Sequence, residues 1–225
     1  MRLRSSASDA QVAGFAPAPR DGVSLSGSGN VDPMLVAAFS MDDRYVVAIR
    51  GIRSSIVQSY GDVSRDTRYC AVIGLDCDEA LAVMAANLGV VMTHMGASTL
   101  VVDANRAAPR VASLLGVADA AQVQQTPIAG LWVAGTGSAD GRSQDPVERR
   151  PLIEQRDEWN VRVDQVVSVM ALNDANGATS IANALAGFDA AVILMRKNVT
   201  RLKRARSLIE ALDQHRVPIV GTVLA

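Results

Sequence analysis

The chain has 225 residues, of which 49% are hydrophobic and 20% charged, and its formal net charge is −1. This composition predicts a soluble globular protein with a substantial core, and the near-neutral charge gives no sign that nucleic acid or an anionic membrane is a partner. Two cysteines make neither a disulfide framework nor a zinc site, so we expect both to be buried free thiols. No apolar run approaches the ~20 residues of a membrane span, and the N-terminus does not resemble a signal peptide. We therefore expect a cytoplasmic protein.

The beginning of the chain, to about Asp32, is rich in Ser, Gly, Ala and Pro and shows neither helical nor strand periodicity. We therefore predict that residues 1–40 form a flexible tail and that residues 41–225 form the folded domain. From Asp42 on, apolar residues recur at helical spacing with arginines between them, which predicts a leading amphipathic helix: Tyr45, Ile49, Ile52 and Ile56, with Arg44, Arg50 and Arg53.

Strands and helices then alternate about six times along the chain. The predicted strands cover residues 69–75, 98–103, 128–134, 165–172, 190–195 and 217–224, and the predicted helices cover 79–95, 108–115, 147–157, 179–186 and 200–215. This alternation predicts an α/β fold with a doubly wound, mostly parallel sheet and helices on both faces. Ligands of such sheets bind outside the carboxyl ends of the strands, so the candidate site lies in the loops after Leu75, Asp103, Ala134, Leu172 and Met195.

The loop after the first strand stands where a nucleotide-binding fold of this kind carries its phosphate loop. Such a loop needs glycines that let backbone N–H groups surround phosphate, a lysine near the β- and γ-phosphates, and a Ser or Thr hydroxyl for Mg²⁺. Residues 74–83 contain one glycine, Gly74, no lysine and no hydroxyl, but three acids, Asp76, Asp78 and Glu79. Because these acids suit a helix N-terminus and repel phosphate, the sequence favours an acid-capped helix over a triphosphate site.

An acidic residue at the end of another strand could still orient Mg²⁺. Asp103 ends the second strand, where a carboxylate can organise Mg²⁺ through water, although Asp is also a common turn residue. The strand predicted over 165–172 carries no acid, and the next polar groups are Asn173 and Asp174. A second Mg²⁺-orienting aspartate is therefore missing or displaced.

The order of several segments resembles one family. Three segments resemble the bacterial tyrosine kinases of polysaccharide co-polymerases, which are deviant-Walker relatives of the MinD and ParA ATPases. The segments are Met84-Ala-Ala-Asn-Leu-Gly89, Gly96 to Arg110 (with Val-Val-Asp-Ala-Asn-Arg-Ala-Ala-Pro-Arg) and Leu114-Leu-Gly116. Residues 130–135, 188–196 and 217–224 are similar to that family's later strands, and the helix with Arg50 and Arg53 is similar to its Glu-x-x-Arg-x-x-Arg assembly motif. The resemblance covers roughly residues 42–225 and implies a P-loop NTPase-like fold of the MinD and ParA type.

The departures from this family fall on its functional positions. The family's lysine falls at Leu81, its Ser and Thr fall at Ala82 and Val83, and the second acid of its Asp-x-Asp falls at Asn105. Its third aspartate falls near Val169, the glutamate of the assembly motif falls at Val47, and no tyrosine cluster follows the last strand. Phosphoryl transfer depends on the lost charges and metal ligands. The resemblance thus implies a nucleotide-binding remnant, a remnant catalytic Asp103 and two assembly residues: Gly74, Asp78, Glu79, Leu81, Ala82, Asp103 and Asn105, with Arg50 and Arg53 for assembly.

Three further features have simpler explanations. A basic cluster near the last helix could meet an acidic partner or a membrane surface, but a solvated helix face is favoured: Arg196, Lys197, Arg201, Lys203, Arg204 and Arg206. His94 and His215 have no partners at metal-ligand spacing, so we expect no metal site. The glycine-bearing loop over 173–180 could bind an anion, yet a helix N-cap at Thr179 is favoured.

The sequence leaves three functions open. The first is a non-catalytic, pseudo-kinase-like cytoplasmic partner of a membrane polysaccharide co-polymerase or chain-length determinant protein, supporting synthesis or export of an exopolysaccharide, capsule or holdfast-type polymer. It would need no cofactor and no nucleic acid, could form a homo-oligomer, and would reach the inner membrane through its partner. The second is a divergent ATPase or tyrosine kinase that uses Asp103, ATP and Mg²⁺. The third is a MinD- or ParA-like positioning ATPase, which a C-terminal amphipathic membrane helix would support, whereas the last predicted element is a strand.

Overall fold

The computed structural model describes residues 31–61, 65–105, 109–118, 122–135, 151–173 and 177–225. The strands in these ranges form one seven-stranded sheet in the order β3-β4-β2-β5-β1-β6-β7, in which every neighbouring pair is parallel except β3 and β4. The strands are β1 (Arg68–Leu75), β2 (Thr99–Asp103), β3 (Gln124–Gln125), β4 (Leu131–Gly135), β5 (Gln165–Leu172), β6 (Ala190–Met195) and β7 (Ile219–Leu224).

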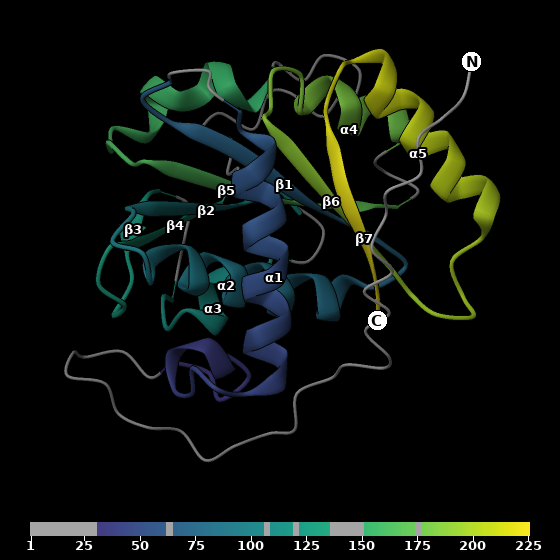
Figure 1. The fold of residues 1–225 in the computed structure, drawn as a ribbon. Helices are drawn as coiled ribbons and strands as arrows, with labels where there is room; N and C mark the ends of the chain where they lie inside the picture. The colour runs from purple at the N-terminus through teal and green to yellow at the C-terminus, as the bar shows by residue number, and fades with distance from the viewer. Residues whose placement is uncertain (1–30, 62–64, 106–108, 119–121, 136–150, 174–176) are drawn as a thin grey trace.

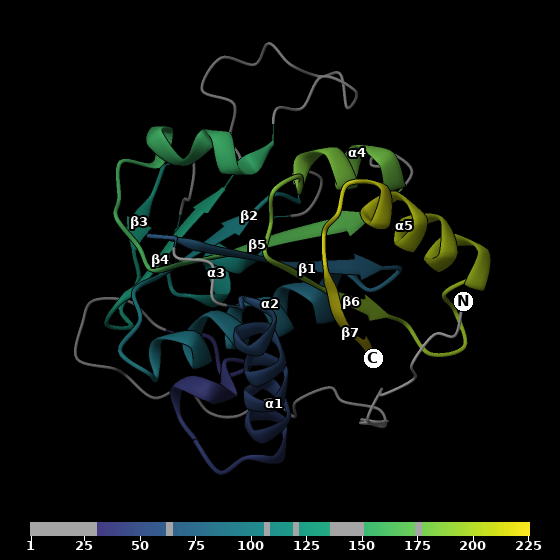
Figure 2. The same ribbon diagram turned by 45° about the horizontal axis from the view of Figure 1, so that its top comes forward.

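Two layers of helices cover this sheet (Figures 1 and 2). One face carries η1 (Val36–Ala38), α1 (Arg44–Ser59), α2 (Asp78–Thr93) and α3 (Val111–Leu114), and the other carries η3 (Leu152–Trp159), α4 (Ala178–Ala184) and α5 (Leu202–Gln214). The predicted α/β fold, with a mostly parallel sheet between two helical layers, is therefore confirmed. Within the described ranges, no helix is both long and apolar enough to cross a bilayer.

The centre of the sheet brings three strand ends together. β1 pairs with β5 along its whole length, so that Leu75 lies opposite Leu172, and β6 places Met195 on the other side of Leu75. Every residue of β1 and β5 after the first is buried, because helices cover both faces. This is why the sequence shows continuous apolar runs here instead of alternation. The loops that follow these three strands therefore meet at one edge of the sheet.

The segment before α1 belongs to the folded domain, although the sequence assigns it to the tail. Val31 and Leu35 are buried in the core. The buried amide of Asn87 on α2 holds this segment, because its Nδ2 donates to the Met34 carbonyl at 3.0 Å and its Oδ1 accepts from the Ala37 N–H at 2.9 Å. A buried amide needs such partners. The predicted start of the domain at residue 41 is thus too late, while residues 1–30 lie outside the described ranges.

Two elements differ from the prediction. The antiparallel strand β3 consists of two exposed glutamines, which carry no apolar pattern that could have predicted a strand. The helix predicted over 147–157 is the 3-10 helix η3, Leu152–Trp159, and the residues before 151 lie outside the described part of the chain.

Candidate functional site

The loop between β1 and α2 is short because the helix begins early. Asp76 has a left-handed backbone with φ of 59°, Cys77 is the N-cap residue, and α2 begins at Asp78. The N–H of Leu81 donates to the Cys77 carbonyl at 2.8 Å, so it is already bonded inside the helix. A phosphate loop needs backbone N–H groups that are free to point at the ligand. The residues before Leu81 form the first turn of α2, where Asp78 and Glu79 place negative charge beside the N–H groups that have no partner within the helix.

Leu81, at the position expected for the lysine, packs on the end of β1. Its side chain is buried, and a Cβ placed on Gly74 would lie 2.8 Å from the Leu81 Cδ2. The absence of a side chain at Gly74 therefore lets helix and strand approach closely, and this glycine serves packing rather than phosphate contact. Ala82 and Val83, at the expected hydroxyl positions, are also buried in the core.

The acids of this loop stabilise the protein's own structure. Asp78 and Glu79 lie in the first turn of α2, and no side chain caps the helix, so the predicted acid cap is replaced by an acidic first turn. Negative charge at this end favours the helix dipole. Glu79 also forms an exposed ion pair with Arg110, at 3.2 Å between the carboxylate and the guanidinium. These charges would repel a phosphate group at the same place.

An arginine from α5 reaches the same edge of the sheet. Arg204 forms an ion pair with Asp76, and its second guanidinium nitrogen donates to the Leu172 carbonyl at 3.0 Å. The Thr200 hydroxyl before α5 donates to the Leu75 carbonyl at 3.1 Å. The sequence favoured a solvated helix face for this arginine. Arg204 instead binds groups of the chain itself. The pairing of Asp76 with Arg204 spans 128 positions, so no local pattern could have indicated it.

Both cysteines are free and buried, as predicted. The thiol of Cys77 donates to the Leu194 carbonyl at 3.4 Å, within the same cluster of strand ends. Burial raises the pKa of the Cys77 thiol to about 12. The thiol is therefore protonated at neutral pH and cannot serve as a nucleophile, since the thiolate is the reactive form.

Asp103, the expected Mg²⁺ remnant, organises the loop that follows β2. Its carboxylate accepts N–H groups from Asn105 at 3.0 Å, Arg110 at 2.9 Å and Val111 at 3.1 Å. Burial raises the pKa of Asp103, and the three N–H donors act in the opposite direction. The side chain is buried, so its oxygen atoms are committed to the backbone. Asn105 is buried beside it, and its Oδ1 has no hydrogen-bond partner among the described residues.

Of the loop after β5, the structure describes only its first residue and its last, Asn173 and Gly177. Asn173 follows the strand directly, and Asp174 lies outside the described residues. Helix α4 has Gly177 as its N-cap residue, with no capping side chain, so the predicted cap at Thr179 is wrong. Across the described ranges, no three His, Cys, Asp or Glu side chains gather closely enough to hold a metal ion.

The two candidate assembly residues lie on α1, away from the strand ends. The guanidinium of Arg53 donates to the Val91 carbonyl near the end of α2 at 3.4 Å, which ties α1 to α2 within the chain. Arg50 is exposed. The nearby His94 has a lowered pKa, first because of burial and then because of these two arginines.

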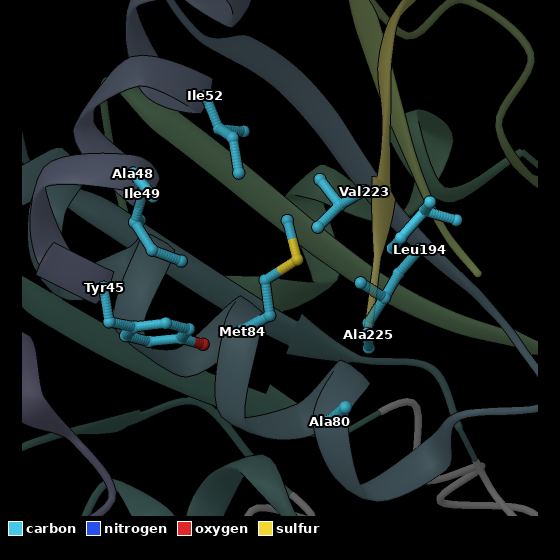
Figure 3. Close-up of a pocket in the computed structure, with 10 residues that line it drawn as sticks. Tyr45, Ala48, Ile49, Ile52, Ala80, Met84, Leu194, Val223 and Ala225 are labelled. Atoms are coloured by element: carbon cyan, nitrogen blue, oxygen red, sulfur yellow. The ribbon is translucent and has the colours of Figure 1, made fainter. Parts of the chain in front are cut away.

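A small apolar pocket lies between α1, the start of α2 and the last strand (Figure 3). Tyr45 and Ile52 line it from α1, Met84 from α2, and Val223 from β7. It holds about 40 Å³ of free space and carries no charged side chain. A triphosphate needs positive charge or free N–H donors, so this pocket does not replace the missing phosphate loop.

Comparison with solved structures identifies the fold. The kinase domain of the Escherichia coli tyrosine kinase ETK superimposes with a TM-score of 0.65 at 17% identity, covering 86% of this chain and 80% of that one. The BceF tyrosine kinase domain gives 0.67 at 18% identity, covering 84% and 81%. The chimeric protein CapA2B2 gives 0.66 at 18% identity, covering 85% and 88%.

These likenesses show that the chain has the fold of bacterial tyrosine-kinase domains, which confirms the expected P-loop NTPase-like architecture. At such identities they concern the fold alone. No family model matches the sequence, and no curated protein matches it either.

Proposed function

We propose that this chain is a non-catalytic, pseudo-kinase-like partner of a membrane polysaccharide co-polymerase, and that it supports synthesis or export of an exopolysaccharide. The early start of α2 carries this proposal. Because α2 begins at Asp78, the N–H of Leu81 is bonded within the helix and the Leu81 side chain packs on Gly74. The positions expected for the lysine and the hydroxyls, Leu81, Ala82 and Val83, are therefore part of the buried core.

Electrostatics at this edge supports the same conclusion. Two positive charges at this edge, on Arg204 and Arg110, are paired with Asp76 and Glu79. The carboxylate of Asp103 is committed to three backbone N–H groups. Phosphoryl transfer is accelerated almost entirely by positioning and charge stabilisation, and neither is available from these groups. The described residues therefore do not fit ATP with Mg²⁺.

Nucleotide binding tests the non-catalytic part of the proposal. We expect isothermal titration of the full chain with ATP and Mg²⁺ to give no binding heat up to millimolar nucleotide. The ETK kinase domain, measured in the same buffer, is the positive control for the fold. Micromolar affinity, or nucleotide turnover above the buffer rate, would replace this proposal with the divergent kinase or ATPase.

The pathway is tested separately in the organism that encodes the chain. Deleting the gene should lower surface polysaccharide, and the wild-type chain should restore it. The Asp103→Asn variant keeps an acceptor for the backbone N–H groups, so it should restore polymer at equal protein level. The partner should be retained by the tagged chain after crosslinking, and should be a membrane co-polymerase. Unchanged polymer after deletion would overturn the pathway even if no nucleotide binds.

A further inference from the structure

The surface around the start of α5 is strongly basic. We call this surface the basic face, and it consists of five exposed side chains: Arg196, Lys197, Arg201, Lys203 and Arg206. No acid lies in the first turn of α5, and the first acid after residue 195 is Glu210. In both views α5 and the segment before it form the outer margin of the domain (Figures 1 and 2). Five positive charges are thus concentrated locally in a chain whose net charge is −1.

These charges do not serve the stability of α5. The N-terminus of a helix carries partial positive charge, which favours acidic and disfavours basic side chains in the first turn. Lys203 nevertheless occupies that turn, two positions after the N-cap residue Arg201. Arg204 is the basic residue of the turn that has a carboxylate partner, Asp76, whereas no ion pair joins the basic face to any described carboxylate. Such an arrangement suits an anion that comes from outside the chain.

Aliphatic side chains accompany the charges. Leu202 is 69% exposed and Val199 is 50% exposed, although large apolar side chains are normally buried. Ile209, seven positions after Leu202 and therefore on the same side of the helix, is 40% exposed. The opposite side of α5, with Leu208 and Leu212, is fully buried on the sheet. The outward side thus combines basic groups with apolar groups.

We propose that the basic face and its aliphatic neighbours seat this protein directly on an anionic phospholipid surface. The guanidinium and ammonium groups would meet lipid phosphates, while Val199 and Leu202 would enter the headgroup region. A nucleic acid would also meet these charges through its phosphates, but residues 196–210 contain no aromatic side chain on which bases could stack. An acidic protein is the other partner that would use both the charges and Leu202, so absence of binding to anionic vesicles would overturn the proposal in favour of such a protein. The contact is independent of nucleotide binding and of a co-polymerase.

Vesicle cosedimentation of the full chain tests this proposal. We expect binding to vesicles of phosphatidylglycerol and phosphatidylcholine, weaker binding at high salt, and none to phosphatidylcholine alone. The double variant Lys203→Glu/Arg206→Glu should lose at least about tenfold in affinity, since each basic residue near an anionic surface contributes roughly fivefold. The control Arg44→Glu/Arg162→Glu changes net charge equally at exposed sites elsewhere and should lose less than about threefold.

A second variant separates lipid from other anions. Leu202→Ser removes an exposed apolar group and keeps every charge, so it should fold normally and bind the anionic vesicles several-fold more weakly. Equal losses in both double variants, or undiminished binding by Leu202→Ser, would overturn the proposal. Binding to single-stranded DNA that is tighter than to vesicles would assign the basic face to nucleic acid instead. Circular dichroism of each variant checks that the fold is intact.

Discussion

Two helices of this domain begin at the same edge of the sheet with opposite charge. Helix α2 follows β1 and begins with Asp78 and Glu79. Helix α5 follows β6, and its first turn carries Lys203 and Arg204 and no acid. The strands before them are neighbours, so the two beginnings share one edge. A phosphate site at α2 would need positive charge, and a stable α5 would prefer negative charge, so each helix has the opposite of what those roles require.

The charged groups at the start of α2 suit their surroundings within the fold, whereas those of the basic face at the start of α5 have no partner among the described carboxylates. At α2 the N–H of Leu81 is bonded, its side chain is buried, and the acids suit the dipole. At α5 the basic face has no partner among the described carboxylates. An external anion is therefore attracted to the start of α5, which carries positive charge that is unpaired among the described residues, rather than to the start of α2, which carries negative charge.

Restoring the expected lysine is the strongest way to break this comparison. We expect Leu81→Lys to lower the free energy of unfolding by roughly 3–5 kcal/mol, because it removes a buried side chain and places an amine against Gly74 in the core. It should not create ATP binding, since the acids Asp78 and Glu79 remain in the first turn of α2 and repel phosphate. Urea denaturation and ATP titration measure the two effects.

The matched control for this variant is Glu79→Lys, on the same turn but exposed. It should cost less than about 1 kcal/mol, mainly through the ion pair with Arg110 and the helix dipole. A stable Leu81→Lys protein that binds ATP would show that α2 can unwind its first turn into a phosphate loop.

Asp103 offers a second way to break the comparison. Asp103→Ala leaves three backbone N–H groups without their acceptor, so it should lower the free energy of unfolding by roughly 2–4 kcal/mol, and Asp103→Asn should cost about half as much. Thermal and urea denaturation measure both. A stable Asp103→Ala protein that lost a wild-type hydrolysis or phosphorylation activity would make Asp103 catalytic rather than structural.

The central strands could be predicted from sequence because a strand that is buried on both faces consists of consecutive apolar residues. β5 and β6 have the predicted bounds, since continuous apolar runs such as Ala190 to Met195 are typical of strands that helices cover on both sides. The start of α2 was predicted within one residue, at Glu79 rather than Asp78. That early start already implied a missing phosphate loop, although the sequence argument relied on residue types instead.

Long-range polar contacts could not be predicted in this way. Arg204 and Asp76 are 128 positions apart, and no period or motif connects them. Asn87 belongs to the segment that resembles the kinase family, yet its role as anchor of Met34 and Ala37 depends on residues that looked like a tail. Side chains that bind backbone groups elsewhere in the chain leave no local pattern, so a sequence can indicate the site's position better than its contacts.

The ion pair between Asp76 and Arg204 allows the comparison to be sharpened. In a double-mutant cycle with Asp76→Asn and Arg204→Gln, we expect a coupling energy of about 1 kcal/mol, because the pair is only partly exposed. Asn tolerates the left-handed backbone at position 76, so the cycle reports charge rather than strain. A coupling near zero would place Arg204 with the unpaired basic face. Chemical denaturation of the four proteins gives the value.

The smallest effect is also the most discriminating. Lys203→Glu places an acid in the first turn of α5, so it should raise the free energy of unfolding by about 0.3–1 kcal/mol, and the gain should shrink in high salt. Lys203→Gln should give about half that gain. Denaturation midpoints at low and high salt test this. The same Lys203→Glu protein should bind anionic vesicles less well, so stability and binding would change in opposite directions. If Lys203→Glu were instead less stable, the positive charge would be serving the fold, and the two helix beginnings would no longer differ in kind.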